Sequence, residues 1–295
     1  MMDQAIRLVE EAFRSWSSGT AANEPRRRVR APNGAMLHLM GAGDSAAGFL
    51  GCKAYASSKD GVYFFVLLFD AETARPLATI EADYLGQVRT AAASGLATKC
   101  MARDDARTLA IVGSGLQAFT QVLAVDCARK LAEVRVFSRD AARRADFASR
   151  LRDHVNAEIR TCESARDTVR GADIVVTATS STHPVFLGEW IEPGMHINAI
   201  GGNAASRREL DEAAVDRAER IVVDSIEQSK IESGELITAF RPDARRWEEV
   251  IELRDVVAGK KPGRATAQEV TLFKSNGVAL EDIALAGWLY KHAAK

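Results

Sequence analysis

Residues 109–118, LAIVGSGLQA, contain the pattern that decides the fold. A short apolar run ends in Gly-x-Gly-x-x-Ala, and apolar residues at helical spacing follow it. Between a strand and a helix, the first glycine (Gly113) permits a tight turn and the second (Gly115) lets the backbone approach a pyrophosphate. The small Ala118 allows the helix to pack closely on the strand, and the helix N-terminus attracts phosphates. The stretch therefore predicts a dinucleotide-binding loop rather than an ordinary glycine turn.

Strand and helix patterns continue to alternate beyond this loop. Apolar, β-branched runs predict further strands at residues 134–137, 158–161, 173–177, 196–199 and 221–223. Residues 116–131 and 141–151 have apolar positions at helical spacing. Unbroken runs such as IVVTA are expected when both faces of a sheet are buried. The predicted fold class is therefore α/β, with a parallel sheet covered by helices as in a Rossmann domain.

The flanking parts of the chain have a different pattern. Residues 36–40, 62–69 and 76–83 resemble strands, and residues 89–101 have Ala and Leu at helical spacing. Residues 275–292 are again a helix candidate, which we expect to pack on the first part of the chain. These segments predict an α+β domain of residues 1–105 and 270–295, separate from a dinucleotide-binding domain of residues 106–269.

Composition limits the classes of function. The chain has 295 residues with a formal net charge of −1, 47% apolar and 27% charged residues, as a water-soluble globular protein does. Such a charge favours neither nucleic acid nor a membrane surface as partner, and no apolar run is long enough to span a bilayer. The first thirteen residues mix acidic and apolar side chains, which predicts an amphipathic helix rather than a signal peptide. The four cysteines form no CxxC pair, so we expect no metal site, no disulfide framework and a cytoplasmic location.

The end of the second predicted strand bears on the choice of cofactor. An acid there normally binds the ribose hydroxyls of NAD. Here the strand is followed by Ser138 and Arg139, and an acid comes only at Asp140. A hydroxyl and a guanidinium suit a 2′-phosphate, because Arg forms charge-assisted hydrogen bonds with phosphate oxygens. This pattern favours NADP(H) over NAD(H), although a solvated arginine at a helix start would give the same letters.

Four stretches carry a resemblance along nearly the whole chain: RTAAASGLAT (89–98), IVGSGLQA (111–118), INAIGGN with the following REL (197–210) and LFKSNGVALEDIA (272–284). In this order they resemble the ornithine cyclodeaminase/mu-crystallin family. The resemblance implies a Rossmann domain, and a substrate-binding and dimerisation domain built from both chain ends, in a homodimer. It also implies an enzyme of amino-acid metabolism that handles an α-imino or α-amino carboxylate beside a nicotinamide. Family members begin slightly upstream of Met1, so we expect a first strand or turn to be missing or the start to be misassigned.

The family's motifs match particular positions of this chain. Its carboxylate-binding residues correspond to Arg27, Lys53 and Arg89, and Asn276 matches a position beside the substrate. The positions that match nucleotide contacts are Gly113, Gly115, Leu116, Gln117, Ser138, Arg139, Thr179, Ile200, Gly201 and Gly202, with Ser275 near the nicotinamide.

The identity of the first arginine is open. Residues 26–30 read RRRVR, so a shift of register offers Arg26, Arg28 or Arg30 in place of Arg27. Side chains alternate along an extended segment, which would place Arg26, Arg28 and Arg30 on one face and Arg27 on the other.

One departure from the family indicates the reaction. The cyclodeaminases and alanine dehydrogenases of the family carry an acid where this chain has Asn203. A carboxylate can act as a general base there, whereas a neutral amide can only orient by hydrogen bonds. The resemblance thus implies NAD(P)H-dependent reduction of a small α-imino acid, cyclic like pyrroline-2-carboxylate or linear like iminosuccinate. Lys53, Arg89 and Asn203 are the expected catalytic residues, with Lys53 either a carboxylate ligand or the donor of the imine proton.

Three other functions stay open at this point. They are an ornithine-type cyclodeaminase, an alanine-type amino-acid dehydrogenase, and a non-catalytic protein that binds NADPH and a ligand, as in the mu-crystallin branch.

Overall fold

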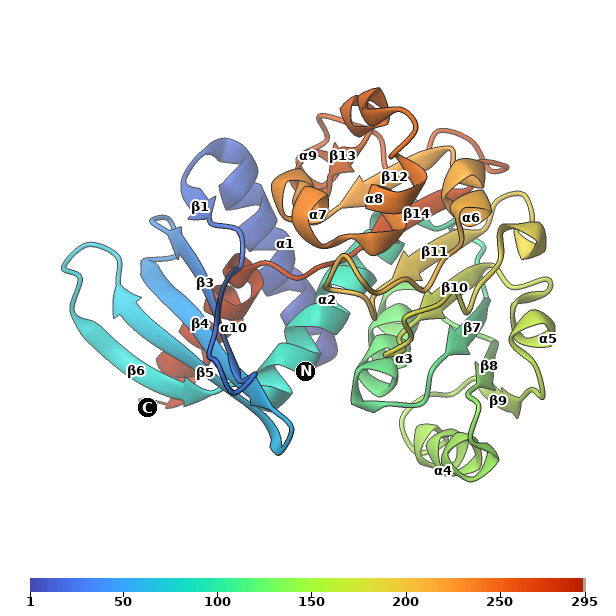
Figure 1. Ribbon diagram of the computed structural model, residues 1–295, viewed down its shortest axis with the longest axis horizontal. Coiled ribbons are helices and arrows are strands. Elements are labelled where there is room, and N and C mark those ends of the chain that lie inside the picture. Colours follow the sequence, from blue (N-terminus) through green and yellow to red (C-terminus); the bar gives the residue numbers. More distant parts are fainter. Residues whose placement is uncertain (294–295) are drawn as a thin grey trace. The chain divides into compact units, whose positions relative to one another are not determined.

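The computed structural model describes residues 1–293, which form two compact units (Figure 1). Residues 3–90 and those from Gly277 onward make the first unit, and residues 91–276 make the second. Helix α2 (Asp83–Met101) belongs to both, because the division falls after Thr90. The expected domain limits at residues 105 and 270 lie within the second unit. The division of substrate and nucleotide binding between the domains remains a prediction.

The first unit is an antiparallel sheet with helices from both ends of the chain. The sheet has the order β1-β3-β4-β5-β6, and β2 also pairs with β3. Its strands are β1 (Ala21–Asn23), β2 (Arg27–Arg30), β3 (Met36–Asp44), β4 (Phe49–Ser58), β5 (Gly61–Asp70) and β6 (Pro76–Glu81). Its helices are α1 (Met2–Ser18), α10 (Ala279–Ala293) and the beginning of α2.

Helix α10 packs on strands β3, β4 and β5 of this sheet. The approach is close enough to require glycine on both sides. A Cβ on Gly51 of β4 would lie 2.7 Å from Cδ1 of Ile283, and one on Gly287 of α10 would lie 2.3 Å from the Phe49 ring. Because these glycines bring helix and sheet together, acids on the first turn of α10 can reach the interior of the unit.

The second unit is an eight-stranded parallel sheet with the order β13-β12-β14-β11-β10-β7-β8-β9. Its strands are β7 (Thr108–Val112), β8 (Glu133–Phe137), β9 (Glu158–Thr161), β10 (Ile174–Thr177), β11 (His196–Ala199), β12 (Arg220–Val223), β13 (Ile251–Glu252) and β14 (Thr271–Lys274). Its helices are α3 (Leu116–Ala128), α4 (Ala141–Leu151), α5 (Ala165–Val169), α6 (Glu212–Arg217), α7 (Ile226–Glu232), α8 (Gly234–Ala239) and α9 (Leu253–Val257), with short 3-10 turns at Gly188–Trp190 and Ala244–Glu248. None of the helices described is long and apolar enough to cross a membrane.

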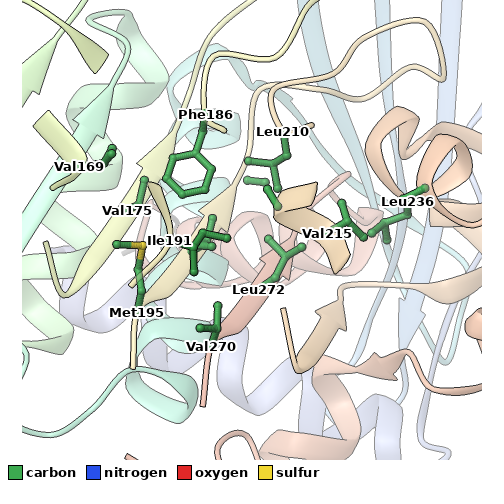
Figure 2. Packing of buried hydrophobic residues seen from close by; sticks show 14 of the residues in the cluster. Val169, Val175, Phe186, Ile191, Met195, Leu210, Val215, Leu236, Val270 and Leu272 are labelled. Carbon is green, nitrogen blue, oxygen red and sulfur yellow. The ribbon is translucent and has the colours of Figure 1, made fainter. Parts of the chain in front are cut away.

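Two apolar clusters lie on opposite faces of this sheet. Along β10, Val175 belongs to one cluster, whereas Ile174 and Val176 belong to the other. Phe186, Ile191 and Leu272 belong to the same cluster as Val175 (Figure 2). This alternation explains the unbroken apolar run of β10, since both of its faces are buried.

The α/β fold, with a second unit built from both chain ends, is confirmed. Some expected boundaries are wrong. The expected helix at 275–292 begins only at Ala279, because Gly277 has a φ of +79°, which a right-handed helix does not allow. The expected strand at 76–83 ends at Glu81, and the expected helix at 89–101 already begins at Asp83. Strands β1, β4, β13 and β14 were not expected.

Candidate active site

The loop after β7 has the geometry that a dinucleotide requires. Gly113 has a φ of +129°, and a Cβ there would lie 2.4 Å from the carbonyl oxygen of Ala178. Gly115 precedes α3, and a Cβ there would meet nothing within 4 Å. No side chain caps the first turn of α3, so its backbone N–H groups are available to an anion. Leu116 beside them is 61% exposed. The residues present therefore fit a dinucleotide pyrophosphate at Gly115.

The end of β8 carries an exposed guanidinium, and its nearest acid caps a helix. Asp140 accepts a hydrogen bond from the backbone N–H of Arg143 at 3.0 Å and so caps α4. The hydroxyl of Ser114 donates to that of Ser138 at 2.9 Å, which ties the glycine loop to the end of β8. Arg139 is exposed. One oxygen of the nearest acid is thus engaged in helix capping, and Arg139 is the exposed cation at the end of β8.

The remaining residues expected to bind the nucleotide follow neighbouring strands. Thr179 comes after β10, Ile200 to Gly202 come after β11, and Ser275 comes after β14. These strands are adjacent and parallel, and β7 lies beside β10. Since parallel strands end at one edge, the second unit brings these positions to the edge at which open α/β sheets bind ligands.

Asn276 is bonded within the second unit. Its side-chain N–H groups donate to the hydroxyls of Ser229 at 2.8 Å and Ser233 at 3.1 Å. Its backbone N–H donates to Asp224 at 2.7 Å, and the hydroxyl of Ser275 donates to the same oxygen at 3.2 Å. These bonds hold the segment between β14 and α10, so Asn276 has a structural task whether or not it also meets substrate. Asn203 lies half-buried in the loop after β11.

A buried charge cluster occupies the interior of the first unit. Lys53 on β4 lies 2.9 Å from Asp282 on α10. Arg89 on α2 lies 2.7 Å from Glu281 and 3.2 Å from Asp282. Lys53 is 2% exposed and Arg89 is 7% exposed. The sheet and two helices therefore converge on two of the predicted carboxylate-binding residues.

Arg26, and not Arg27, belongs to this interior. Arg26 is 4% exposed, and its guanidinium donates to the carbonyl oxygen of Gly277 at 3.3 Å. Arg27, Arg28 and Arg30 lie on β2 and are all exposed. The expected alternation therefore does not describe this segment, because Arg26 precedes the strand. Of the four candidates, Arg26 has the placement that suits a ligand of a buried carboxylate.

Two glycines make room for the cationic side chains. A Cβ on Gly277 would lie 2.4 Å from Nη1 of Arg89, and Gly277 has a φ of +79°. A Cβ on Gly86 would lie 2.9 Å from Nζ of Lys53. Gly277, the glycine of the FKSNG segment, is thus favoured for two reasons. Its positive φ suits glycine, and any side chain there would collide with Arg89.

Burial and neighbouring cations lower pKa values in and beside the cluster. Burial lowers the pKa of Lys53, and Arg89 and Arg26 lower it further, whereas Asp282 opposes these effects. Burial, with Arg28 and Arg26 nearby, lowers the pKa of His38 to about 4, so this ring is neutral near pH 7.

The cluster's formal charge follows from its members. They are the cations Arg26, Lys53 and Arg89 and the carboxylates Glu281 and Asp282. With all five side chains ionised their formal charges sum to +1, which a singly charged anion would neutralise.

The full chain, residues 1–295, matches the family model described as the ornithine cyclodeaminase/mu-crystallin family. This protein belongs to that family.

Solved structures of family members share its fold. The Δ1-pyrroline-2-carboxylate reductase of Thermococcus litoralis, in complex with NADH and L-proline, is 34% identical with a TM-score of 0.94; the match covers 100% of this chain and 94% of the other. An archaeal alanine dehydrogenase dimer with bound NAD is 33% identical with a TM-score of 0.93, covering 100% and 92%. The iminosuccinate reductase of Paracoccus denitrificans, in complex with NAD+, is 31% identical with a TM-score of 0.90, covering 100% and 93%. The protein is thus an NAD(P)-dependent oxidoreductase of amino or imino acids.

Sequence reasoning missed the acids of the cluster. Glu281 and Asp282 are fully buried in VALEDIALA, where two acids interrupt an apolar helix. Buried carboxylates need cationic partners, so this interruption was the available signal. Among residues 1–293, no group of three or more His, Cys, Asp or Glu side chains is arranged to hold a metal ion.

We expect Gly277→Ala to disturb the charge cluster. The left-handed backbone alone should lower the free energy of unfolding by about 1–2 kcal/mol. Displacement of Arg89 from its buried ion pairs should add roughly 1–3 kcal/mol. Urea unfolding measures both, with Gly34→Ala as the control, because Gly34 has a φ of +88° and nothing within 4 Å of its Cβ position. Equal losses in the two variants would contradict the steric role of Gly277.

Proposed function

We propose that this protein reduces a small α-imino monocarboxylate to the amino acid with NAD(P)H. The observation that carries the proposal is the buried cluster of Arg26, Lys53 and Arg89, whose formal charge with Glu281 and Asp282 is +1 when all five side chains are ionised. A substrate carboxylate would complete the cluster. The nucleotide-binding loop at Gly113 supplies the site for the other reactant.

The reaction needs a polarised C=N bond and a fixed carbon. The reduced nicotinamide supplies the hydride when it is bound. Arg26 and Arg89 can hold the carboxylate by charge-assisted hydrogen bonds, each contributing on the order of 1.5–3 kcal/mol. Lys53 is the candidate donor of the imine proton, because a lowered pKa brings an ammonium closer to the range of a useful acid.

Asn203 favours reduction of a preformed imine. Assembly of an imine from ammonia and an oxo acid, or loss of ammonia from a diamino acid, requires a base to accept protons as C–N bonds form or break. A side-chain amide has no useful basicity near pH 7. This supports reduction over the dehydrogenase and cyclodeaminase alternatives.

The excess charge favours a monocarboxylate. A second carboxylate on the substrate would need a further cation, and the additional arginines of the RRRVR segment point to solvent on β2. Burying an uncompensated carboxylate is costly. We therefore place cyclic imines such as pyrroline-2-carboxylate ahead of iminosuccinate.

We also propose that the cofactor is NADP(H) and that the working form is a homodimer. Arg139 supports the first point, because it is exposed at the end of β8, where a guanidinium suits a 2′-phosphate. The archaeal alanine dehydrogenase, which is a dimer, supports the second.

A substrate panel tests the reaction. We expect NADPH oxidation with pyrroline-2-carboxylate or piperideine-2-carboxylate, with kcat/KM roughly tenfold or more above that for iminosuccinate, because an unpaired buried charge costs more than 1.4 kcal/mol. Loss of NADPH absorbance measures the rates. Pyruvate with ammonia tests the dehydrogenase alternative, and ammonia release from ornithine tests the cyclodeaminase. If no imine is turned over, or if pyruvate with ammonia matches the best imine, the proposal is wrong.

Paired variants test which arginine binds the carboxylate. Arg26→Met should raise KM for the imine roughly 10- to 100-fold, because a charge-assisted bond is lost. Arg27→Met is the matched control one residue away, and its KM should stay within about twofold, since its side chain is exposed. A larger effect at Arg27 would return the role to the position that the family resemblance first indicated.

A second pair tests the cofactor. Arg139→Ala should weaken NADPH binding about tenfold and leave NADH binding within about twofold, because only NADPH carries the 2′-phosphate. The control is Arg143→Ala, an exposed arginine on the first turn of α4. Titration calorimetry gives each Kd. If Arg139→Ala weakens both cofactors equally, the assignment of NADP(H) fails.

A further inference from the structure

We propose that Glu209 is the positioning residue for the nicotinamide side of the cofactor site. Its single carboxylate joins the segments that follow β10 and β11. The inference rests on the dinucleotide site proposed above, and it assigns a role to the acid of the REL segment.

Glu209 receives four hydrogen bonds from two strand ends. One carboxylate oxygen accepts from the hydroxyl of Thr177 at 2.8 Å and from the backbone N–H of Gly201 at 2.7 Å. The other accepts from the backbone N–H and the hydroxyl of Thr179, at 2.6 and 2.7 Å. The side chain is fully buried. Thr179 and Gly201 are both expected cofactor contacts, so one group sets the position of two of them.

The sheet order assigns these contacts to the nicotinamide half. Strand β7 lies between β8 and β10. In this architecture the end of the second strand binds the adenosine ribose, and the glycine loop after the first strand binds the pyrophosphate. In this protein the second strand is β8 and the first strand is β7. The other half of a dinucleotide must therefore extend over the ends of β10 and β11, where Thr179 and Gly201 lie.

The two segments are in direct contact at Glu209. A Cβ on Gly201 would lie 2.1 Å from the carbonyl oxygen of Thr179 and 2.5 Å from Oε1 of Glu209. Only glycine fits at this point, so the contact is held both by packing and by the carboxylate. Loss of the carboxylate would free the segments to separate.

A second layer of charged groups ties this contact to β14. The backbone N–H of Glu209 donates to Glu235 at 2.8 Å. Lys274, at the end of β14, lies 3.6 Å from Glu235, and its ammonium donates to the carbonyl oxygen of Gly202 at 2.6 Å. Glu235 and Lys274 are both buried. The network thus reaches the strand that leads to Ser275, the position expected near the nicotinamide.

The hydrogen bonds favour the ionised form of Glu209. Burial raises the pKa of this carboxyl group, whereas the bonds from Thr179 and Gly201 and the charge of Lys274 oppose that shift. Two of the four groups around it are backbone N–H groups, which can only donate. A glutamine at position 209 would turn its NH2 group toward one of these backbone N–H groups. Two donors would then face each other, and the backbone N–H would lose its acceptor.

Binding of cofactor fragments tests the proposal. In Glu209→Gln we expect NADPH affinity to fall roughly 10- to 100-fold, because a buried donor loses its acceptor. Affinity for adenosine 2′,5′-bisphosphate should stay within about twofold, since this fragment reaches neither Thr179 nor Gly201. NADH and ADP form the equivalent pair if the protein prefers NADH. Titration calorimetry gives each Kd, and the ratio of the two losses distinguishes positioning from a general loss of structure.

Glu269→Gln is the matched control. Glu269 is also buried, accepts a hydrogen bond from a backbone amide and pairs with Arg220 at 2.8 Å, but it precedes β14 at the opposite edge of the sheet. Both affinities should be unchanged in this variant. An equal loss of NADPH affinity in the two variants would overturn the proposal.

The remaining outcomes also decide the matter. If the unmodified protein binds no dinucleotide, the proposed function itself is wrong. If it binds NADPH and Glu209→Gln weakens both ligands equally, or neither, the positioning role alone is wrong. If Glu209→Gln does not fold, Thr177→Val removes one of the four donors with little change of shape. It should weaken NADPH binding about threefold or more, with the fragment unaffected; equal effects on both ligands would again contradict the role.

Discussion

The structure depends on pairing positive charge within the first unit. Lys53 and Arg89 are almost completely buried, and an ion moved out of water without a partner costs several kcal/mol. The compensating acids, Glu281 and Asp282, come from the first turn of the last helix. The sheet from the beginning of the chain and the helix at its end must therefore meet. The unit is built from two stretches that are far apart in the sequence, because the buried cations need these acids and because the helix packs on the sheet.

In the same cluster, the cationic side chains outnumber the acidic ones. Buried ion pairs add little stability relative to well-packed apolar residues, and removal of one partner is strongly destabilising. A cluster with one cation more than its acids is therefore a poor way to stabilise a fold, but a suitable way to prepare a site for an anion. A ligand that binds only the folded state also adds to its stability. In the function proposed above, the substrate carboxylate would be the anion that this cluster binds.

Particular residues show what the sequence could and could not predict. Strand β10 was predictable because its apolar run has to bury two faces, and the Gly113 loop because few residues fit a positive φ and a close backbone approach. Strand β4 was missed, since FLGCKAYASS is rich in small and polar residues and is held by pairing with β3 and β5. Arg26 could not be chosen over Arg27, because the choice depends on where β2 begins. Glu209 gave no local signal, since its donors belong to strand ends distant in sequence.

The fold alone does not decide the reaction. A pyrroline-2-carboxylate reductase, an alanine dehydrogenase and an iminosuccinate reductase match this chain with 31–34% identity and TM-scores of 0.90–0.94. Such similar scaffolds with different substrates imply that a few positions select the chemistry. Two kinds of position can do so here. In the reaction proposed above, the residue at 203 either can or cannot accept a proton, and the number of buried cations would set how much negative charge the substrate can carry. In our proposal, Asn203 and the formal charge of the ionised cluster both favour a neutral imine beside one carboxylate.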